Sequence, residues 1–143
     1  MDNEVKWYVF RVVHGTEESV VGVVNDAWFP KRVYSDGGKA VTVPLVHGIF
    51  FYPCKGDAPH WHYRHKQNIF SLMVNPDKTP ITIADADMTV FRLACNAHLN
   101  RARAILDRGE TLSNGWVAAS TETISKALKT LLGPAGFEFE VKS

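Results

Sequence analysis

Short stretches of β-branched and aromatic residues alternate along the chain with segments that have helical spacing. The first stretch, Val5 to Val13, has apolar residues on both alternating faces, which predicts a strand that is covered on both sides. Thr16 then precedes two glutamates and a set of valines at helical spacing, which favours a short helix. Gly22 and the valines lower the helix propensity of this segment, so a strand is the competing interpretation.

The middle of the chain predicts two pairs of strands. The first pair surrounds a turn at Gly37 and Gly38, and its returning strand bends at Pro44, which cannot donate to a strand ladder. The second pair surrounds a proline turn at Asn75–Lys78. The polar run from Cys54 to Asn68 is expected to form a short helix or an ordered loop. The predicted strands cover Trp28–Tyr34, Val41–Tyr52, Ile69–Val74 and Ile81–Ile83.

Two helices are predicted in the last 60 or so residues. The first has its cap at Asp85 and ends at Gly109, and the second runs from a cap at Ser120 or Thr121 to Gly133, after a polar connection. A half-buried strand, Phe137–Val141, follows. The buried stripe of the first helix is expected to contain Met88, Phe91, Cys95, His98, Leu99, Ala102, Ile105 and Leu106, and that of the second Ile124, Leu128, Leu131 and Leu132.

This order of elements predicts an α/β fold. Residues 1–108 are expected to form the main domain. Residues 109–143 are expected to form a C-terminal appendage of linker, helix and strand. The length of 143 residues fits one main domain.

Composition narrows the range of functions. There are 16 Lys and Arg against 15 Asp and Glu, so a surface that binds phosphate backbones everywhere is excluded, and any nucleic-acid contact must be local. The first residues do not resemble a secretion signal, and no apolar run approaches the roughly 20 residues that span a bilayer. We therefore expect a cytoplasmic protein with no membrane contact.

Two groups of residues suggest chemistry. His60, His62 and His65, with Cys54 upstream, are residue types that bind zinc, but their spacing fits no zinc signature, so we expect no metal site. Cys95 and His98 resemble a nucleophile and its base, but both lie in the predicted buried stripe of a helix. We therefore expect no enzyme activity, no cofactor and no small-molecule substrate.

Six short motifs, in order from Val5 to Arg103, resemble the N-terminal domain of the NusG family of transcription elongation factors. They are Lys6-Trp7-Tyr8-Val9, Gly15 with Glu17, Phe29-Pro30 before the glycine hairpin, Pro44-Leu45-Val46-His47-Gly48-Ile49-Phe50-Phe51, Trp61-His62-Tyr63-Arg64, and Pro80-Ile81-Thr82-Ile83 before Asp85 and Met88.

The resemblance implies that residues 1–108 form an α+β plait, an antiparallel four-stranded sheet with flanking helices as in ferredoxin-like domains. It also implies a factor that docks on the clamp helices of RNA polymerase through an apolar hollow and suppresses pausing or termination. We expect this hollow to be open to solvent. The implied polymerase contacts are Arg11, Val46, His47, Phe51, Met88 and Phe91. The implied contacts to nontemplate or upstream DNA are Lys31, Arg32 and Lys39.

The C-terminal part differs from most members of that family, which carry a KOW barrel of about 50 residues. The 34 residues after Gly109 are too few for a predicted helix and a complete barrel, so the chain looks most like the operon-specific antiterminators of the UpxY and RfaH type. If the apolar face of the last helix lies on Phe51 and Met88, the tail masks the docking surface. The alternative function is a plait that binds single-stranded nucleic acid without a polymerase partner, using Phe50, Phe51 and Tyr52 to stack bases.

Overall fold

The computed structural model describes residues 4–13, 15–23, 26–37, 39–55 and 69–133. The predicted element between Cys54 and Asn68 and the predicted strand Phe137–Val141 lie wholly or largely outside these residues. The elements are β1 (Val5–Val12), α1 (Glu17–Val23), β2 (Lys31–Asp36), β3 (Lys39–Pro44), β4 (Ile49–Lys55), β5 (Ile69–Leu72), β6 (Thr82–Ala84), α3 (Asp85–Asp107) and α4 (Asn114–Leu132).

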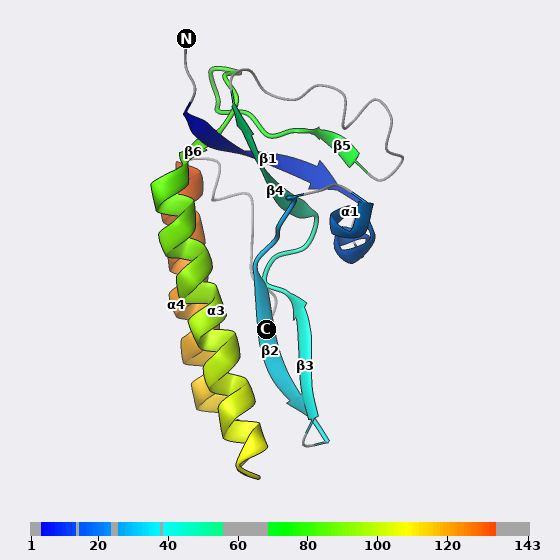
Figure 1. Cartoon of the computed structure of the whole chain (residues 1–143), viewed down its shortest axis with the longest axis vertical. Coiled ribbons are helices and arrows are strands. Elements are labelled where there is room, and N and C mark those ends of the chain that lie inside the picture. The colour runs from blue at the N-terminus through cyan, green and yellow to red at the C-terminus, as the bar shows by residue number, and fades with distance from the viewer. Residues whose placement is uncertain (1–3, 14, 24–25, 38, 56–68, 134–143) are drawn as a thin grey trace.

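The main sheet is built around β1, and all of its pairings are antiparallel (Figure 1). β4 pairs along one edge of β1, and β5 and β6 pair in succession along the other edge, so the sheet is three strands wide. Trp7 and Val9 enter the apolar cluster on one face, whereas Tyr8 and Phe10 enter the cluster on the other. The prediction that the first strand is covered on both sides is therefore confirmed.

The β2–β3 hairpin forms a separate two-stranded sheet (Figure 1). The prediction of one returning strand through residue 52 is wrong, because β3 ends at Pro44 and β4 pairs with β1 instead. Gly48 lies at the redirection with a φ of 85°, a conformation that favours glycine. A Cβ at this position would lie 3.4 Å from the carbonyl oxygen of Val12.

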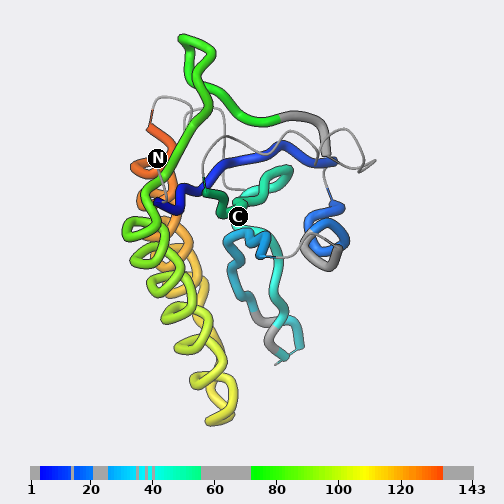
Figure 2. The backbone as a smooth tube through the Cα atoms, turned by 45° about the horizontal axis from the view of Figure 1, so that its top comes forward, coloured from blue at the N-terminus to red at the C-terminus, as the bar shows by residue number. Residues whose placement is uncertain are grey.

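The helices cover both faces of the main sheet (Figures 1 and 2). α1 contributes Val20 to the cluster on one face, and α3 and α4 lie side by side on the other. The structure thus confirms a mixed α/β class with antiparallel sheets. α4 shares the largest apolar cluster with β1, β4 and α3, so the helix predicted for the appendage packs into the common core.

α3 has the predicted buried stripe but not the predicted cap. Met88, Phe91, Cys95 and Ala102 are buried along it. Its N-cap is Ala84, with no side-chain hydrogen bond, and Asp85 instead accepts a hydrogen bond of 2.8 Å from Nε1 of Trp7. The predicted capping role of Asp85 is therefore wrong, because a buried indole N–H takes its carboxylate as acceptor.

The cap of α4 lies seven or eight residues earlier than the sequence predicts. This cap is Ser113, whose Oγ accepts a hydrogen bond of 3.0 Å from the backbone N–H of Trp116. Trp116 and Val117 pack against a small apolar cluster that contains Val33 of β2 and Ala102 of α3. The predicted caps at Ser120 or Thr121 and the predicted polar connection up to Ala119 are therefore wrong.

The cap at Ser113 makes a first testable prediction. Ser113→Ala is expected to lower the free energy of unfolding by about 1 kcal/mol, because the N–H of Trp116 loses its acceptor. Urea-induced unfolding followed by circular dichroism measures this change. Ser113→Asp keeps an acceptor at the cap and should leave stability close to that of the parent chain, and equal losses in both variants would contradict the capping role.

Candidate docking site

Four of the six predicted polymerase contacts are buried. The exposed fractions are 2% for Val46, 0% for Phe51, 0% for Met88 and 3% for Phe91. All four belong to the same apolar cluster, so the structure brings them together as predicted. The expectation that they line a hollow open to solvent is wrong, because other residues of the chain cover them.

The cover has two parts. α4 contributes Ile124, Leu128 and Leu132, which are buried in the same cluster as Phe51 and Met88. The apolar face of the C-terminal helix therefore packs into the same cluster as the predicted docking residues. Ser120 of α4 also bonds to α3, with its Oγ 2.7 Å from Nδ1 of His98.

Trp28 is the second part of the cover. Its ring lies 5.8 Å from that of Phe91 in an edge-on arrangement and 6.0 Å from that of Phe51. The backbones of Trp28 and Phe51 also exchange hydrogen bonds of 2.9 and 2.6 Å. Because Trp28 precedes the hairpin in the sequence, this part of the cover does not depend on α4.

Arg11 and His47, the other two predicted polymerase contacts, lie nearer the surface. Arg11 is an exposed residue of β1. The His47 side chain is 36% exposed, and its Nδ1 lies 3.8 Å from Oε1 of Glu17. Glu17 is itself buried and accepts a hydrogen bond of 2.8 Å from the backbone N–H of Gly48. A buried carboxylate therefore holds the turn that carries His47.

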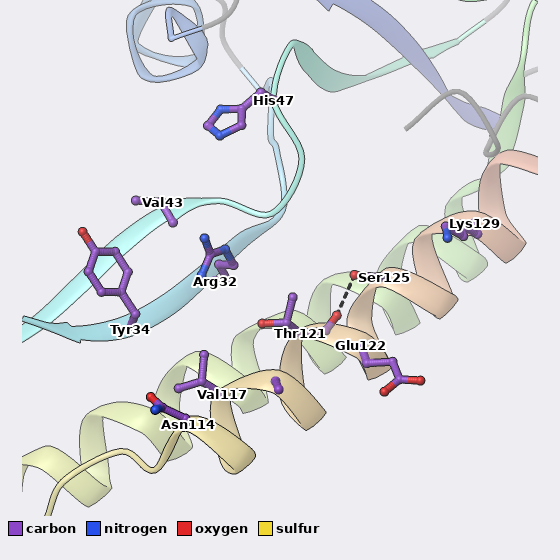
Figure 3. A pocket seen from close by; sticks show the side chains of 11 residues that line it. Arg32, Tyr34, Val43, His47, Asn114, Val117, Thr121, Glu122, Ser125 and Lys129 are labelled. Atoms are coloured by element: carbon purple, nitrogen blue, oxygen red, sulfur yellow. Dashed lines mark hydrogen bonds between the residues drawn. The ribbon is translucent and has the colours of Figure 1, made fainter. Parts of the chain in front are cut away.

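A cavity of about 970 Å³ lies beside the buried cluster, between the hairpin and α4 (Figure 3). Arg32, Tyr34 and Val43 line it from the hairpin, and the guanidinium carbon of Arg32 lies 6.0 Å from the centre of the Tyr34 ring. His47 lines it from the turn after β3. α4 lines the opposite side of the cavity with Asn114, Val117, Ala118, Thr121, Glu122, Ser125 and Lys129. The cavity therefore combines apolar and aromatic groups with both cationic and anionic side chains.

The three predicted DNA contacts do not share one surface. Lys31 pairs with Glu18 of α1 at 3.0 Å, and its Nζ lies 5.0 Å from the centre of the Phe29 ring. Arg32, the next residue on β2, lines the cavity beside α4. Lys39 is exposed at the far end of the hairpin, where it pairs with Asp36 in the strand register. These cations are close together in the sequence, but in the structure one pairs with α1, the next faces the cavity and the third lies at the hairpin end. The sequence alone did not show this separation.

Cys95 is unsuited to act as a nucleophile. Its side chain is 1% exposed, and burial raises its pKa to about 12, so the thiol stays protonated near neutral pH. His98 bonds to Ser120 rather than to the thiol. In the part of the chain that the structure describes, no group of three or more His, Cys, Asp or Glu residues is placed to hold a metal ion. His60, His62 and His65 lie outside that part.

The raised pKa makes a second testable prediction. At pH 8 iodoacetamide should label the half-buried Cys54 and leave Cys95 unmodified, because a thiol with a pKa of about 12 has only about one ten-thousandth of its population as thiolate at that pH. Mass spectrometry of the native chain measures the two sites. Unfolding in urea should make both react, and equal labelling in the native chain would contradict the burial of Cys95.

Comparisons with protein-family models, curated proteins and solved structures find no match to this chain. The resemblance to the NusG family therefore rests on the six motifs alone. Among the described residues, no helix has the length and apolar character that crossing a bilayer requires.

Proposed function

We propose that this chain is a cytoplasmic transcription elongation or antitermination factor that docks on the clamp helices of RNA polymerase, and that α4 covers its docking surface in the conformation described here. One observation carries the proposal. Four of the six residues that the resemblance assigns to docking share a single apolar cluster, and an amphipathic helix from the C-terminal part of the chain packs into it. The N-terminal domain that this implies is the plait of the NusG family.

The cover and the proposed partner use the same kind of contact. α4 presents Ile124, Leu128 and Leu132 on one face, which is how an amphipathic helix occupies an apolar groove. The paired helices of a polymerase clamp would offer an apolar ridge to the same groove. Since both cannot occupy it together, binding to polymerase requires α4 to leave, and the apparent affinity falls with the fraction of molecules in the open form.

α4 can move without unfolding the sheet. It follows α3 through the short connection Arg108–Ser113, and none of its residues pairs in either sheet. β1, β4, β5 and β6 are joined by backbone hydrogen bonds that do not involve α4. Displacement of α4 would therefore uncover the side of the cluster that α4 packs on and leave the strand pairing in place, while Trp28 stays in contact with Phe51 and Phe91.

The experiment compares polymerase binding by the parent chain and by a variant with a weakened cover. Ile124→Ala with Leu128→Ala removes apolar contacts of α4 and leaves every proposed docking residue unchanged. We expect the affinity for isolated clamp helices to rise about tenfold or more, because a larger fraction of the molecules is open. Fluorescence anisotropy of a labelled clamp-helix hairpin measures the change.

The matched control changes exposed residues of the same helix. Thr123→Ala with Thr130→Ala removes two exposed side chains of α4 and should leave the affinity unchanged. Circular dichroism of both variants checks that the strands and α3 stay folded. An unchanged affinity in the weakened variant would overturn the masking, and an absence of binding in every form of the chain would overturn docking on polymerase.

The cavity favours a second candidate function, the binding of single-stranded nucleic acid. Arg32 and Lys129 supply cations on opposite walls, and Tyr34 supplies an aromatic ring on which a base can stack. An affinity for a bare oligonucleotide that falls steeply with salt and is lost in Arg32→Ala would support this function. Apolar docking on polymerase should instead survive high salt.

A further inference from the structure

The outer face of α3 carries two strongly exposed apolar side chains. Val90 is 68% exposed and Leu93 is 63% exposed. Among the described residues, Val74 is the one other large apolar side chain that is exposed. Single exposed apolar residues are common on protein surfaces. Val90 and Leu93 differ from that case because they are neighbours three positions apart on one helix.

These two residues belong to a longer exposed row. The row follows α3 with spacings of four and three residues in alternation, which is the a and d pattern of a helix that pairs with another helix. α3 has 23 residues, and at 1.5 Å per residue it is about 34 Å long, so it can present the row over almost three heptads. All six members are exposed: Ala86, Val90, Leu93, Ala97, Asn100 and Ala104.

The opposite face of α3 is already buried. Met88, Phe91, Cys95 and Ala102 pack toward the sheet, α4 and the hairpin. α3 lies at the outside of the molecule with α4 behind it in Figure 1. The helix therefore has one buried apolar stripe and one exposed apolar row, and the exposed row has no covering element among the residues described.

The charged residues beside the row indicate which partner fits it. Asp87 and Arg101 are both exposed, and they occupy equivalent flanking positions two heptads apart. If two copies of α3 pair in parallel, both residues occupy e positions, which face g positions of the other copy, and neither meets an opposite charge there. If they pair antiparallel, Asp87 of each copy lies opposite Arg101 of the other, and the helix dipoles also oppose favourably.

We propose that two copies of this chain associate through the outer faces of α3 in an antiparallel pair. The two-fold axis passes close to Ala94, midway between Asp87 and Arg101. Leu93 then packs against Ala97 of the second copy, and the alanines let the two helices approach closely. Because the row lies on the face of α3 opposite the proposed polymerase site, this inference goes beyond that function and does not depend on it.

The first test measures the oligomeric state of the full chain by sedimentation velocity over a range of concentrations. We expect a reversible dimer. Leu93→Lys should raise its dissociation constant about tenfold or more, because this side chain lies at the centre of the proposed interface. Ala119→Lys, on the exposed surface of α4, is the matched control and should leave the constant unchanged. Circular dichroism should show both variants folded, since each replaced side chain is exposed.

The second test separates the two orientations. Asp87→Arg alone and Arg101→Asp alone should each weaken the dimer, because each places like charges opposite one another in an antiparallel pair. The double variant with both changes restores opposite charges only in the antiparallel arrangement, so it should recover the affinity of the parent chain. The proposal is overturned if the parent chain stays monomeric at its highest stable concentration, if Leu93→Lys leaves the dimer intact, or if the double variant fails to recover.

Discussion

Replacing Phe51 by alanine is expected to lower the free energy of unfolding by about 3–5 kcal/mol. The ring is fully buried, and it lies on β4 opposite Val9 of the central strand β1. It also contacts the ring of Trp28 at 6.0 Å. Truncation leaves a cavity between the sheet and its helical layer, which the surrounding side chains fill only in part. Urea-induced unfolding measures the loss.

Phe51→Leu is the control for this prediction. It keeps most of the apolar volume, so its loss of stability should stay below about 1.5 kcal/mol. A loss of less than about 1 kcal/mol in Phe51→Ala would contradict the packing described here. The prediction also affects the test of function, because weak polymerase binding by an alanine variant at this position reports loss of folding as well as loss of contact. Variants of α4 avoid this ambiguity, since they leave the docking residues unchanged.

The sequence predicted those helices and strands whose own residues carry a clear propensity or apolar spacing. β1 carries β-branched and aromatic residues along its whole length, and α3 carries a long apolar stripe that ends at Gly109. α4 was predicted in its second half, where Ile124 and Leu128 set the spacing. Its first two turns begin with Asn114 and Gly115, and Ser120 stands where the apolar stripe would continue, so the spacing does not show them. Packing of Trp116 against the hairpin and α3 stabilises these turns, and such a contact cannot be read from the segment alone.

Four of the six predicted polymerase contacts share one apolar cluster, but the sequence did not show that they would be buried. Met88 and Leu93 are both apolar residues of α3, yet the first is fully buried and the second is 63% exposed. The spacing along the helix separates these residues into two faces but does not say which face another element will cover. That outcome depends on where α4 packs, and α4 is distant in the sequence from β4. The cavity was missed for the same reason, because its walls are the hairpin and α4.

Glu17 contacts the predicted docking residue His47. In the sequence, Glu17 stood out only as part of a motif and of the first turn of a helix. The structure buries it to 2% exposure, which is unusual for a carboxylate. Its Oε1 accepts hydrogen bonds from the backbone N–H groups of Gly48, at 2.8 Å, and Gly15, at 3.4 Å. It also lies 3.8 Å from Nδ1 of His47. One carboxylate therefore ties the start of α1 to the turn between β3 and β4.

Replacing Glu17 by alanine is expected to lower the free energy of unfolding by about 3 kcal/mol, because the partly buried backbone N–H of Gly48 loses a charged acceptor. Glu17→Gln keeps an oxygen acceptor and should lose about half as much or less. Glu18→Ala is the matched control, since this neighbour is 70% exposed and pairs with Lys31 at the surface, and its effect should stay within about 1 kcal/mol. Urea-induced unfolding compares the three variants, and equal effects of Glu17→Ala and Glu18→Ala would show that the buried carboxylate does not hold the turn that carries His47.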